Sequence, residues 1–417
     1  MSATATATPA SPAPVRRKRL LPRLLLGVSA MILLFSVVRT VSGADQLTSV
    51  GTISAALGLA VPIGMAALGG LWAERSGVVN IGLEGMMILG TWGAGWAGYQ
   101  WGPWAGVGMA IAMGAFGGAL HAIATVWFGV DHIVSGVAIN VLGLGLATYL
   151  AAATFVGVPG GGATQSPPIP TMGTVTIPGL SDAMDTLAGK EIFFVSDFAG
   201  LIGGLITNVS YITIIAVLLL VATWWLLWKS SFGLRLRSCG EAPYAAESLG
   251  VNVYKYKSIA VVASGALAGF GGSYLAIVAA QQYREGQTAG RGYIGLAAMI
   301  FGNWRPGGLA SGAGLFGYAD ALQLRNAEAV HALLLVGAIA LAAIAILSLR
   351  RGSVVSAVVL GGLGAGMLVW YLLTDTVPPQ FAFMTPYVTT LLVLSLASQR
   401  LRMPAADGQP YRRGAGR

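Results

Sequence analysis

Apolar runs long enough to cross a lipid bilayer follow one another along almost the whole chain. A membrane-spanning helix needs about 20 apolar residues. The predicted spans are 24–42, 50–72, 84–100, 103–128, 133–157, 206–228, 258–280, 306–324, 330–349, 354–373 and 379–398. The shorter run 292–303 is predicted as a half-length or re-entrant segment. The pattern therefore predicts an all-α, polytopic helical membrane protein with about 10–12 transmembrane helices.

Composition excludes a soluble globular protein. Of the 417 residues, 55% are hydrophobic and only 9% are charged, against roughly 25% charged in ordinary globular proteins. The 60 glycines are scattered through apolar runs, as in transmembrane helices, where glycine lets backbones approach closely. The single cysteine, Cys239, excludes a disulfide framework and a cysteine-based metal site. No metal and no cofactor is expected.

Charge predicts the orientation in the membrane. The net charge is +9, and the basic residues cluster beside predicted spans. They are Arg16, Arg17, Lys18, Arg19, Arg23, Lys229, Arg235, Arg237, Lys255, Lys257, Arg350, Arg351, Arg400, Arg402, Arg412, Arg413 and Arg417. The positive-inside rule places them, and both termini, in the cytoplasm. Because no single basic domain exists, nucleic-acid binding is not expected.

The chain is thereby divided into three parts. Residues 1–19 are predicted as a disordered basic cytoplasmic N-terminus, 20–400 as the transmembrane domain, and 401–417 as a basic cytoplasmic tail. Within the transmembrane domain, the acidic loop 158–205 is expected outside and the basic loop 229–257 in the cytoplasm. The first apolar run also resembles a signal peptide, but an uncleaved helix is expected because the topology then closes with both termini inside.

The segment from Gly77 to Gly85 carries the most conspicuous polar residues of any span. If it is helical, Asn80 and Glu84 share one face. Its glycines, Gly82 among them, favour a broken helix, whose freed backbone groups are buried in protein or line a cavity. A carboxylate at the bilayer centre costs roughly 2.5–3.5 kcal/mol. Glu84 is therefore expected either in a polar pathway or, alternatively, solvated in a turn that faces the cytoplasm.

A fainter copy of this segment follows later in the chain. Residues 294–296 repeat the Ile-Gly-Leu of 81–83, inside Gly290–Leu296. Interrupted helices at matching positions of internal repeats place the substrate site of many transporters near the membrane midplane. A pseudo-repeat is therefore predicted, with Gly292 and Gly295 at the pathway. Asn140 is expected either in the pathway or in a hydrogen bond between helices, and His121 as a packing histidine.

The cytoplasmic loop 229–257 contains a predicted short helix from Glu241 to Leu249. Pro243 suits the first turn of this helix, and Gly250 a stop after it. The helix is expected to dock a cytoplasmic partner, the alternative being an amphipathic helix on lipid headgroups. The sequence has no G-x-x-x-x-G-K-[ST] phosphate-binding loop, no G-x-S-x-G motif and no H-E-x-x-H motif, so the chain is not expected to be an enzyme.

Several segments together resemble one family. They are Glu74–Met87, Asp131–Asn140, Gly240–Gly250, Gly290–Gly302 and Pro404–Tyr411. They are similar to bacterial ATP-binding-cassette (ABC) importer permeases of the branched-chain amino acid, ribose and nucleoside type, above all to the nucleoside or simple-sugar subfamily. The extended N-terminus and the long loop 158–205 depart from that pattern.

The resemblance implies a multi-pass permease in a prokaryotic plasma membrane. Its partners would be a second homologous permease, two cytoplasmic ATPase subunits, an extracytoplasmic substrate-binding lipoprotein and membrane lipid. The pathway candidates are Asn80, Gly82, Glu84, Asn140, Gly292 and Gly295. The residues expected to couple to the ATPase are Gly240, Glu241, Ala242, Pro243, Ala245, Ala246 and Gly250.

Two other functions stay open from the sequence. One is a permease of the same family that carries ribose or another simple sugar. The other is an ion-coupled secondary transporter with Glu84 as its coupling carboxylate.

Overall fold

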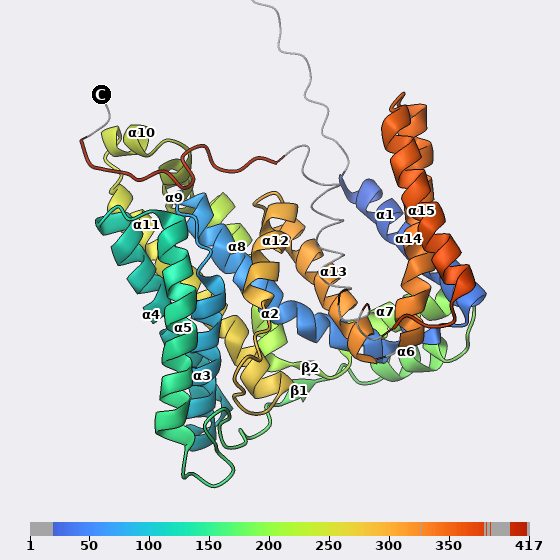
Figure 1. Cartoon of the computed structure of the whole chain (residues 1–417), viewed down its shortest axis with the longest axis horizontal. Coiled ribbons are helices and arrows are strands. Elements are labelled where there is room, and N and C mark those ends of the chain that lie inside the picture. The colour runs from blue at the N-terminus through green and yellow to red at the C-terminus, as the bar shows by residue number, and fades with distance from the viewer. Residues whose placement is uncertain (1–19, 326, 379–380, 382–383, 385–400, 415–417) are drawn as a thin grey trace, which may run out of the picture.

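The computed structural model describes residues 20–325, 327–378, 381, 384 and 401–414 and is almost entirely helical (Figure 1). The predicted N-terminal segment 1–19 and nearly all of the predicted span 379–398 lie outside the described residues. Within them, seven helices are long and apolar enough to cross a membrane. These are Asp45–Arg75, Pro103–Trp127, His132–Phe155, Tyr211–Lys229, Val253–Ala279, Ala329–Arg350 and Val354–Leu373. The chain is a polytopic helical membrane protein.

Each predicted span in this part of the chain coincides with a long helix. The helices are α1 (Leu20–Ser42), α2 (Val50–Arg75), α3 (Leu83–Trp101), α4 (Pro103–Ala122), α5 (His132–Phe155), α8 (Tyr211–Lys229), α11 (Val253–Ser273), α13 (Pro306–Arg325), α14 (Ala327–Arg350) and α15 (Val354–Leu373). A 3-10 turn, η1 (Asp45–Leu47), precedes α2. Two π-helical turns, η2 (Ile123–Trp127) and η3 (Tyr274–Ala279), continue α4 and α11. The predicted fold class is confirmed.

The segment 158–205 is more structured than the predicted loop. It contains strand β1 (Thr174–Val175), α6 (Leu180–Ala188) and most of α7 (Val195–Ile206). Strand β1 pairs antiparallel with β2 (Val209–Ser210). Helix α8 therefore begins at Tyr211 and not at residue 206, because the Ser210 side chain caps it by accepting a hydrogen bond from the Thr213 N–H.

The loop 229–257 is also largely helical. It forms α9 (Ser231–Glu241) and the six-residue α10 (Pro243–Ser248). The predicted helix from Glu241 to Leu249 is thus wrong at both ends. Ala242 is extended, at φ −151° and ψ 80°, because a residue that precedes proline is driven out of the helical region. The chain bends there, and α9 and α10 are separate helices.

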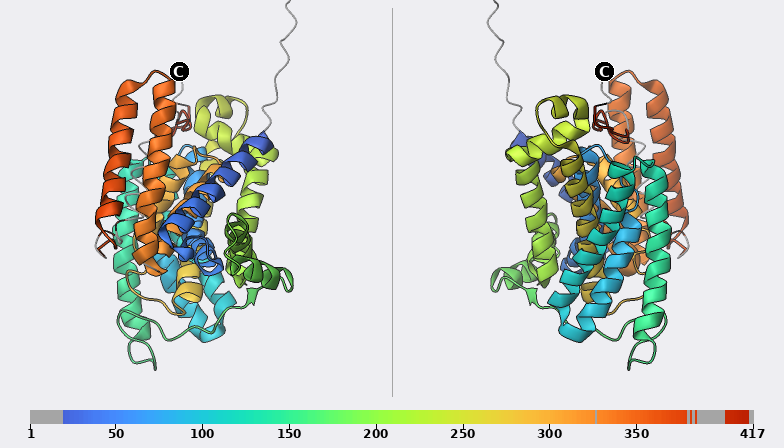
Figure 2. Two further views of the ribbon diagram at one scale, coloured as in Figure 1. Left: turned by 90° about the vertical axis from the view of Figure 1, so that its right-hand side faces the viewer. Right: turned by 90° about the vertical axis from the view of Figure 1, so that its left-hand side faces the viewer.

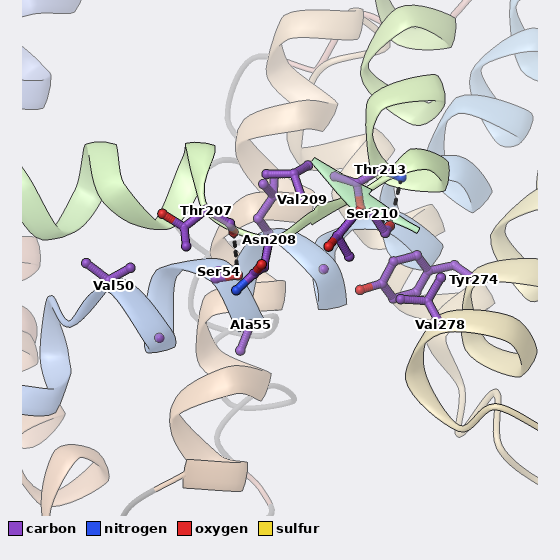
Figure 3. A pocket seen from close by; sticks show the side chains of 14 residues that line it. Val50, Ser54, Ala55, Thr207, Asn208, Val209, Ser210, Thr213, Tyr274 and Val278 are labelled. Carbon is purple, nitrogen blue, oxygen red and sulfur yellow. Dashed lines mark hydrogen bonds between the residues drawn. The ribbon is translucent and has the colours of Figure 1, made fainter. Parts of the chain in front are cut away.

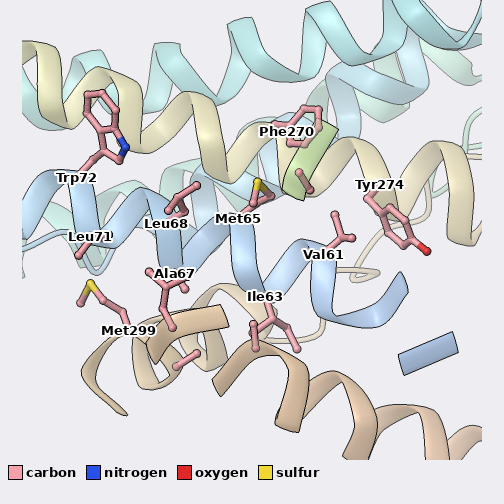
Figure 4. Packing of buried hydrophobic residues seen from close by; sticks show 14 of the residues in the cluster. Val61, Ile63, Met65, Ala67, Leu68, Leu71, Trp72, Phe270, Tyr274 and Met299 are labelled. Carbon is pink, nitrogen blue, oxygen red and sulfur yellow. The ribbon is translucent and has the colours of Figure 1, made fainter. Parts of the chain in front are cut away.

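Helix α2 lies at the centre of the bundle. All residues from Val61 to Glu74 are buried, and Figure 4 shows α2 side chains meeting Phe270 of α11 on one side and Met299 of α12 on another. Helix α12 spans Arg291–Phe301. Helices α14 and α15 pair at one edge of the bundle, and α3, α4 and α5 gather at the opposite edge (Figures 1 and 2). A helix that is apolar all round belongs in such a core.

Helices α4 and α11 approach each other through glycine. A Cβ atom on Gly265 would clash with the backbone of Gly114, and one on Gly269 with the carbonyl oxygen of Ala110. Small residues at such contacts let helix backbones pack directly inside a membrane. The glycine content noted in the sequence therefore has a packing role in this pair.

Gly265→Ala tests that packing. The added methyl group has no room, and overpacking typically costs about 1–3 kcal/mol. We expect a lower apparent melting temperature of the detergent-purified chain. Gly108→Ala on α4 is the matched control, because a Cβ atom there meets nothing within 4 Å and alanine favours helix. A similar effect of the two substitutions would contradict the close approach.

Candidate functional site

The chain between α2 and α3, residues 76–82, interrupts the two helices inside the protein. Ser76 and Asn80 are fully buried. Gly77 adopts a φ of +84°, which glycine tolerates without strain and which turns the chain out of α2. Inside a bilayer the freed backbone groups need partners from the protein. The Val79 N–H finds the Nδ1 atom of His132 at 3.3 Å, and the Val79 carbonyl lies 3.1 Å from Nε2 of His121.

Two asparagine side chains bind the interruption. Asn80 donates to Ser264 Oγ at 2.9 Å and accepts from the Gly82 N–H at 3.0 Å. Asn140 of α5 accepts from the Gly85 N–H at 2.8 Å and donates to the Ile81 carbonyl at 2.9 Å. Each amide thus replaces backbone partners that a continuous helix would have supplied.

Glu84 joins this interruption to the beginning of α12. Its side chain is buried, and its two oxygens accept from the N–H groups of Gly290, at 2.9 Å, and Gly292, at 2.6 Å. The first N–H groups of a helix have no intrahelical acceptors, and the positive end of the helix dipole favours a carboxylate there. The segments predicted as a pseudo-repeat therefore meet in space. The alternative of a solvated Glu84 facing the cytoplasm is wrong.

The other end of α12 is also held by α2. Arg75 donates to the Trp304 carbonyl from Nε at 3.1 Å and from Nη2 at 2.7 Å, and the Trp304 indole N–H donates to Glu74. With 11 residues, α12 is about 16 Å long, roughly half of a bilayer core. The predicted half-length segment is confirmed, and residues at and just beyond the C-terminal end of α2 contact both of its ends.

The structure brings most of the predicted pathway residues together. Asn80, Gly82, Glu84, Asn140 and Gly292 lie in three sets of hydrogen bonds that meet along residues 80–85, and together we call them the interruption cluster. Gly295 lies one turn further along α12, where an added Cβ atom would be 2.6 Å from the Cβ atom of Ala66. The contact of these residues with a transported solute stays a prediction. His121 is buried and lies 2.8 Å from Ser135 Oγ, so its predicted packing role is confirmed.

The predicted coupling segment lies on the surface at the end of α2. An added Cβ atom on Gly240 would clash with the Arg75 backbone, and Glu241 forms a 3.7 Å ion pair with Arg75. Pro243 and Ala246 form the buried side of α10. Ala245 is exposed, and so is Leu249 just before Gly250. Helix α10 therefore presents a small apolar surface to solvent while α9 anchors it to α2.

The sequence did not predict that the C-terminal tail packs on this segment. Residues 401–414 run across α9 and α10 (Figure 1). The Ala406 N–H donates to the Gly240 carbonyl at 2.9 Å, and the Ala405 N–H donates to Glu241 Oε2 at 3.2 Å. The Tyr411 ring lies 5.3 Å from that of Tyr244. Ala406 and Tyr411 are buried, and apolar residues of this kind within a basic tail are a signal of docking that the sequence offers.

Two titratable groups of this face are perturbed by burial. Burial raises the pKa of Asp407 to about 7, and the charges of Lys257 and Arg75 offset this only partly. A hydrogen bond with the Glu74 carboxyl also lowers the pKa of Asp407 and offsets part of this rise. Burial also raises the pKa of the Cys239 thiol to about 11, which makes it unreactive. Within the described residues, no group of His, Cys, Asp and Glu is arranged to hold a metal ion.

Known proteins resemble the chain over most of its length. The family described as "Branched-chain amino acid transport system / permease component" matches residues 52–344. The guanosine ABC transporter permease protein NupQ of Bacillus subtilis is 34% identical, over 87% of this chain and 96% of NupQ. The nucleoside ABC transporter permease protein NupC of Lactococcus lactis is 32% identical, over 84% of this chain and 93% of NupC.

An archaeal protein is similar to the same extent. The putative glucose ABC transporter permease protein TsgC13 of Haloferax volcanii is 32% identical, over 87% of this chain and 98% of TsgC13. No solved structure matches the chain.

Glu84→Ala is expected to destabilise the interruption cluster. It leaves the N–H groups of Gly290 and Gly292 without acceptors. Each buried N–H group without a partner lowers the free energy of unfolding by about 1–3 kcal/mol. The apparent melting temperature of the purified chain should fall, and Glu84→Gln should lower it less because one acceptor oxygen is kept. Glu285→Ala, at an exposed carboxylate bonded to Thr148, is the control. Equal losses for Glu84→Ala and Glu84→Gln would argue against the capping role.

Docking of the tail is expected to depend on pH through Asp407. Its pKa is higher in the docked state than in solvent, where it is about 3.9. Docking is therefore strongest below that value and weakens as pH rises through about 7. Hydrogen exchange of residues 401–414, corrected for intrinsic rates, should show more opening above this pH than below it. Asp407→Asn should remove the difference, and its persistence in that variant would refute the assignment.

Proposed function

This chain belongs to the branched-chain amino acid transport system permease family, and on that premise we propose that it forms the translocation pathway of an ATP-driven importer of nucleosides. The nucleoside substrate is inferred from the similarity to permeases named for guanosine and for nucleosides, which extends over most of this chain and nearly all of each relative. The family is a membrane component of transporters, so ATP hydrolysis is assigned to separate subunits.

The proposed assembly has four kinds of components. They are this permease, a second homologous permease, two cytoplasmic ATPase subunits and an extracytoplasmic substrate-binding lipoprotein. The basic residues beside α9 and α10 favour a cytoplasmic position for the coupling segment, with both chain termini on the same side of a prokaryotic plasma membrane. The segment 158–205, with four acids against one lysine, then faces the outside.

The contacts of Arg75 offer a route by which the ATPases act on the pathway. Pressure on α10 reaches α9 and, through the Glu241–Arg75 pair, the end of α2. Arg75 also holds the Trp304 carbonyl beyond α12. A displacement of α10 therefore shifts the half-length helix α12 and, through Glu84, the interruption cluster. Rigid movement of one part of a transporter around a midplane site gives alternating access.

A simple sugar is the second candidate substrate. It is favoured by the similarity to TsgC13, which is named as a putative glucose permease. The ion-coupled alternative has less support, because both oxygens of Glu84 already accept backbone hydrogen bonds. A coupling carboxylate has to exchange its proton with solvent or the ion pathway.

Reconstitution distinguishes these functions. The full assembly in proteoliposomes should take up guanosine only with ATP, the ATPase subunits and the binding protein present. Uptake of glucose in place of guanosine would contradict the nucleoside assignment but not the assignment as an ATP-driven importer. Uptake by this chain alone, abolished by an uncoupler, would establish the secondary transporter instead.

Ala245→Arg tests the docking of α10. Ala245 is exposed, so the fold should tolerate arginine there. An arginine that is buried in an interface without a charged partner costs several kcal/mol of binding free energy. We expect co-purification with the ATPase subunit to fall by more than roughly tenfold. Ala183→Arg on exposed α6 is the same exchange on the predicted outer face and should leave co-purification unchanged. Wild-type binding by Ala245→Arg would place the docking site elsewhere.

A further inference from the structure

A cavity of about 420 Å³ opens between the beginning of α2, the β1–β2 pair and the turn η3 (Figure 3). We call it the outer cavity, because Thr174 of the segment 158–205, which is predicted outside, lines it together with Thr207, Asn208, Val209 and Ser210 just beyond that segment. It is lined by none of the residues of the interruption cluster. Its volume lies within the range of pockets that hold small molecules, about 300–1,000 Å³.

The outer cavity is polar but uncharged. Among the described residues, none of the 14 that line it carries a formal charge, yet they include the hydroxyls of Ser54, Ser210 and Tyr274 and the amide of Asn208. The adjoining cavity of about 440 Å³ is different, because Arg39, Asp45, Asp185 and Glu191 line it. The absence of charge is therefore a property of this cavity and not of the whole outer face.

Hydrogen-bonding groups in the outer cavity are available to a ligand. Tyr274 Oη makes no hydrogen bond with any residue that the structure describes, and Figure 3 shows it directed toward Ser210 and Asn208. The Asn208 amide oxygen accepts from Thr176 at 3.1 Å, whereas its nitrogen donates to no group within the described ranges. A buried tyrosine hydroxyl normally finds a partner, so a solute that supplies one is favoured.

Two unusual backbone conformations position these groups. Tyr274 is the first residue of the π-helical turn η3, and Asn208 has a φ of +52°. Short π-helical turns occur often at functional sites, and asparagine tolerates the left-handed conformation in a turn, which sets the direction of the Asn208 side chain. Gly58 of α2 leaves room for the Tyr274 hydroxyl, because an added Cβ atom there would collide with Tyr274 Oη.

We propose that the outer cavity is a binding station for a neutral hydroxylated solute, with Tyr274 and Asn208 as its hydrogen-bonding residues. This inference rests on the proposed transport function and adds a binding site for its substrate outside the interruption cluster. A nucleoside or a sugar offers hydroxyl and amide groups and no charge, which matches the lining. A zwitterionic amino acid brings a carboxylate and an ammonium group, and burying each without a charged partner is strongly unfavourable.

The experiment is protection of a cysteine placed at the rim of the cavity. Thr174→Cys lies on exposed β1, and the native Cys239 is buried, so a membrane-impermeant maleimide should label only the new thiol. The full assembly is labelled in membrane vesicles of outside-out orientation with guanosine, glucose or leucine present. We expect guanosine or glucose to slow labelling and leucine to leave it unchanged. Asp182→Cys on exposed α6 is the reporter control, which no solute should protect.

Second substitutions link the protection to the proposed residues. Added to Thr174→Cys, Tyr274→Phe removes one hydrogen bond and should raise the solute concentration for half-protection about fivefold. Gly58→Ala should act in the same direction by displacing the hydroxyl. Tyr283→Phe is the matched control, because Tyr283 is also buried but packs on Phe155 and does not line the cavity.

The outcomes separate this inference from the function on which it rests. Protection that Tyr274→Phe weakens and Tyr283→Phe does not supports the binding station. An assembly that transports guanosine or glucose while labelling of Thr174→Cys is unaffected by either overturns the station and leaves the importer intact. An assembly that transports leucine and neither neutral solute overturns both.

Discussion

A bilayer offers no hydrogen-bonding partners to a peptide backbone, and this constraint determines how the centre of the protein is built. The chain leaves the helical path between α2 and α3 inside the bundle, where every freed N–H and C=O group needs a partner from the protein. Asn80 and Asn140 provide several of these partners, and Glu84 does the same for the first N–H groups of α12. The polar residues that stand out in an apolar sequence thus satisfy backbone groups first, and any contact with solute is added to that role.

Glu84 has the largest structural consequence among them. It reaches from the first turn of α3 to the first N–H groups of α12, so a half-length helix too short to cross the membrane is fixed at its inner end. Arg75 and Glu74 fix the segment just beyond its other end. Arg75 and Glu74 at the end of α2 and Glu84 in the first turn of α3 thus hold α12 from both sides, so we expect α12 to move together with these helices. The scarcity of charge in the chain is consistent with this, since Arg39, Glu84, Asp197 and Lys257 are buried and each has a backbone or ionic partner.

The sequence is sufficient for the features that depend on local pattern. Apolar runs located the long helices, and the glycines beside Glu84 located the interruption and its fainter copy at 290–296. It could not identify the partner of Glu84, because those N–H groups come from a segment more than 200 residues away. The docking of the C-terminal tail could not be predicted either, because its partners are also distant in the sequence. Its contacts with Gly240 and Glu241 involve backbone N–H groups, which every residue except proline has and which leave no pattern.

Helix α2 connects the two surfaces to which functions are assigned. Ser54 and Gly58, near its beginning, line the outer cavity, and Arg75, at its end, contacts the coupling segment. Between them Pro62 has no N–H group, so the carbonyl of Gly58 lacks its helical donor and the helix can bend there at low cost. Gly58 is also the residue against which Tyr274 packs. A bend of α2 at this point therefore changes the wall of the outer cavity directly, while the segment from Val61 to Glu74, enclosed by the core, moves as one body with α12.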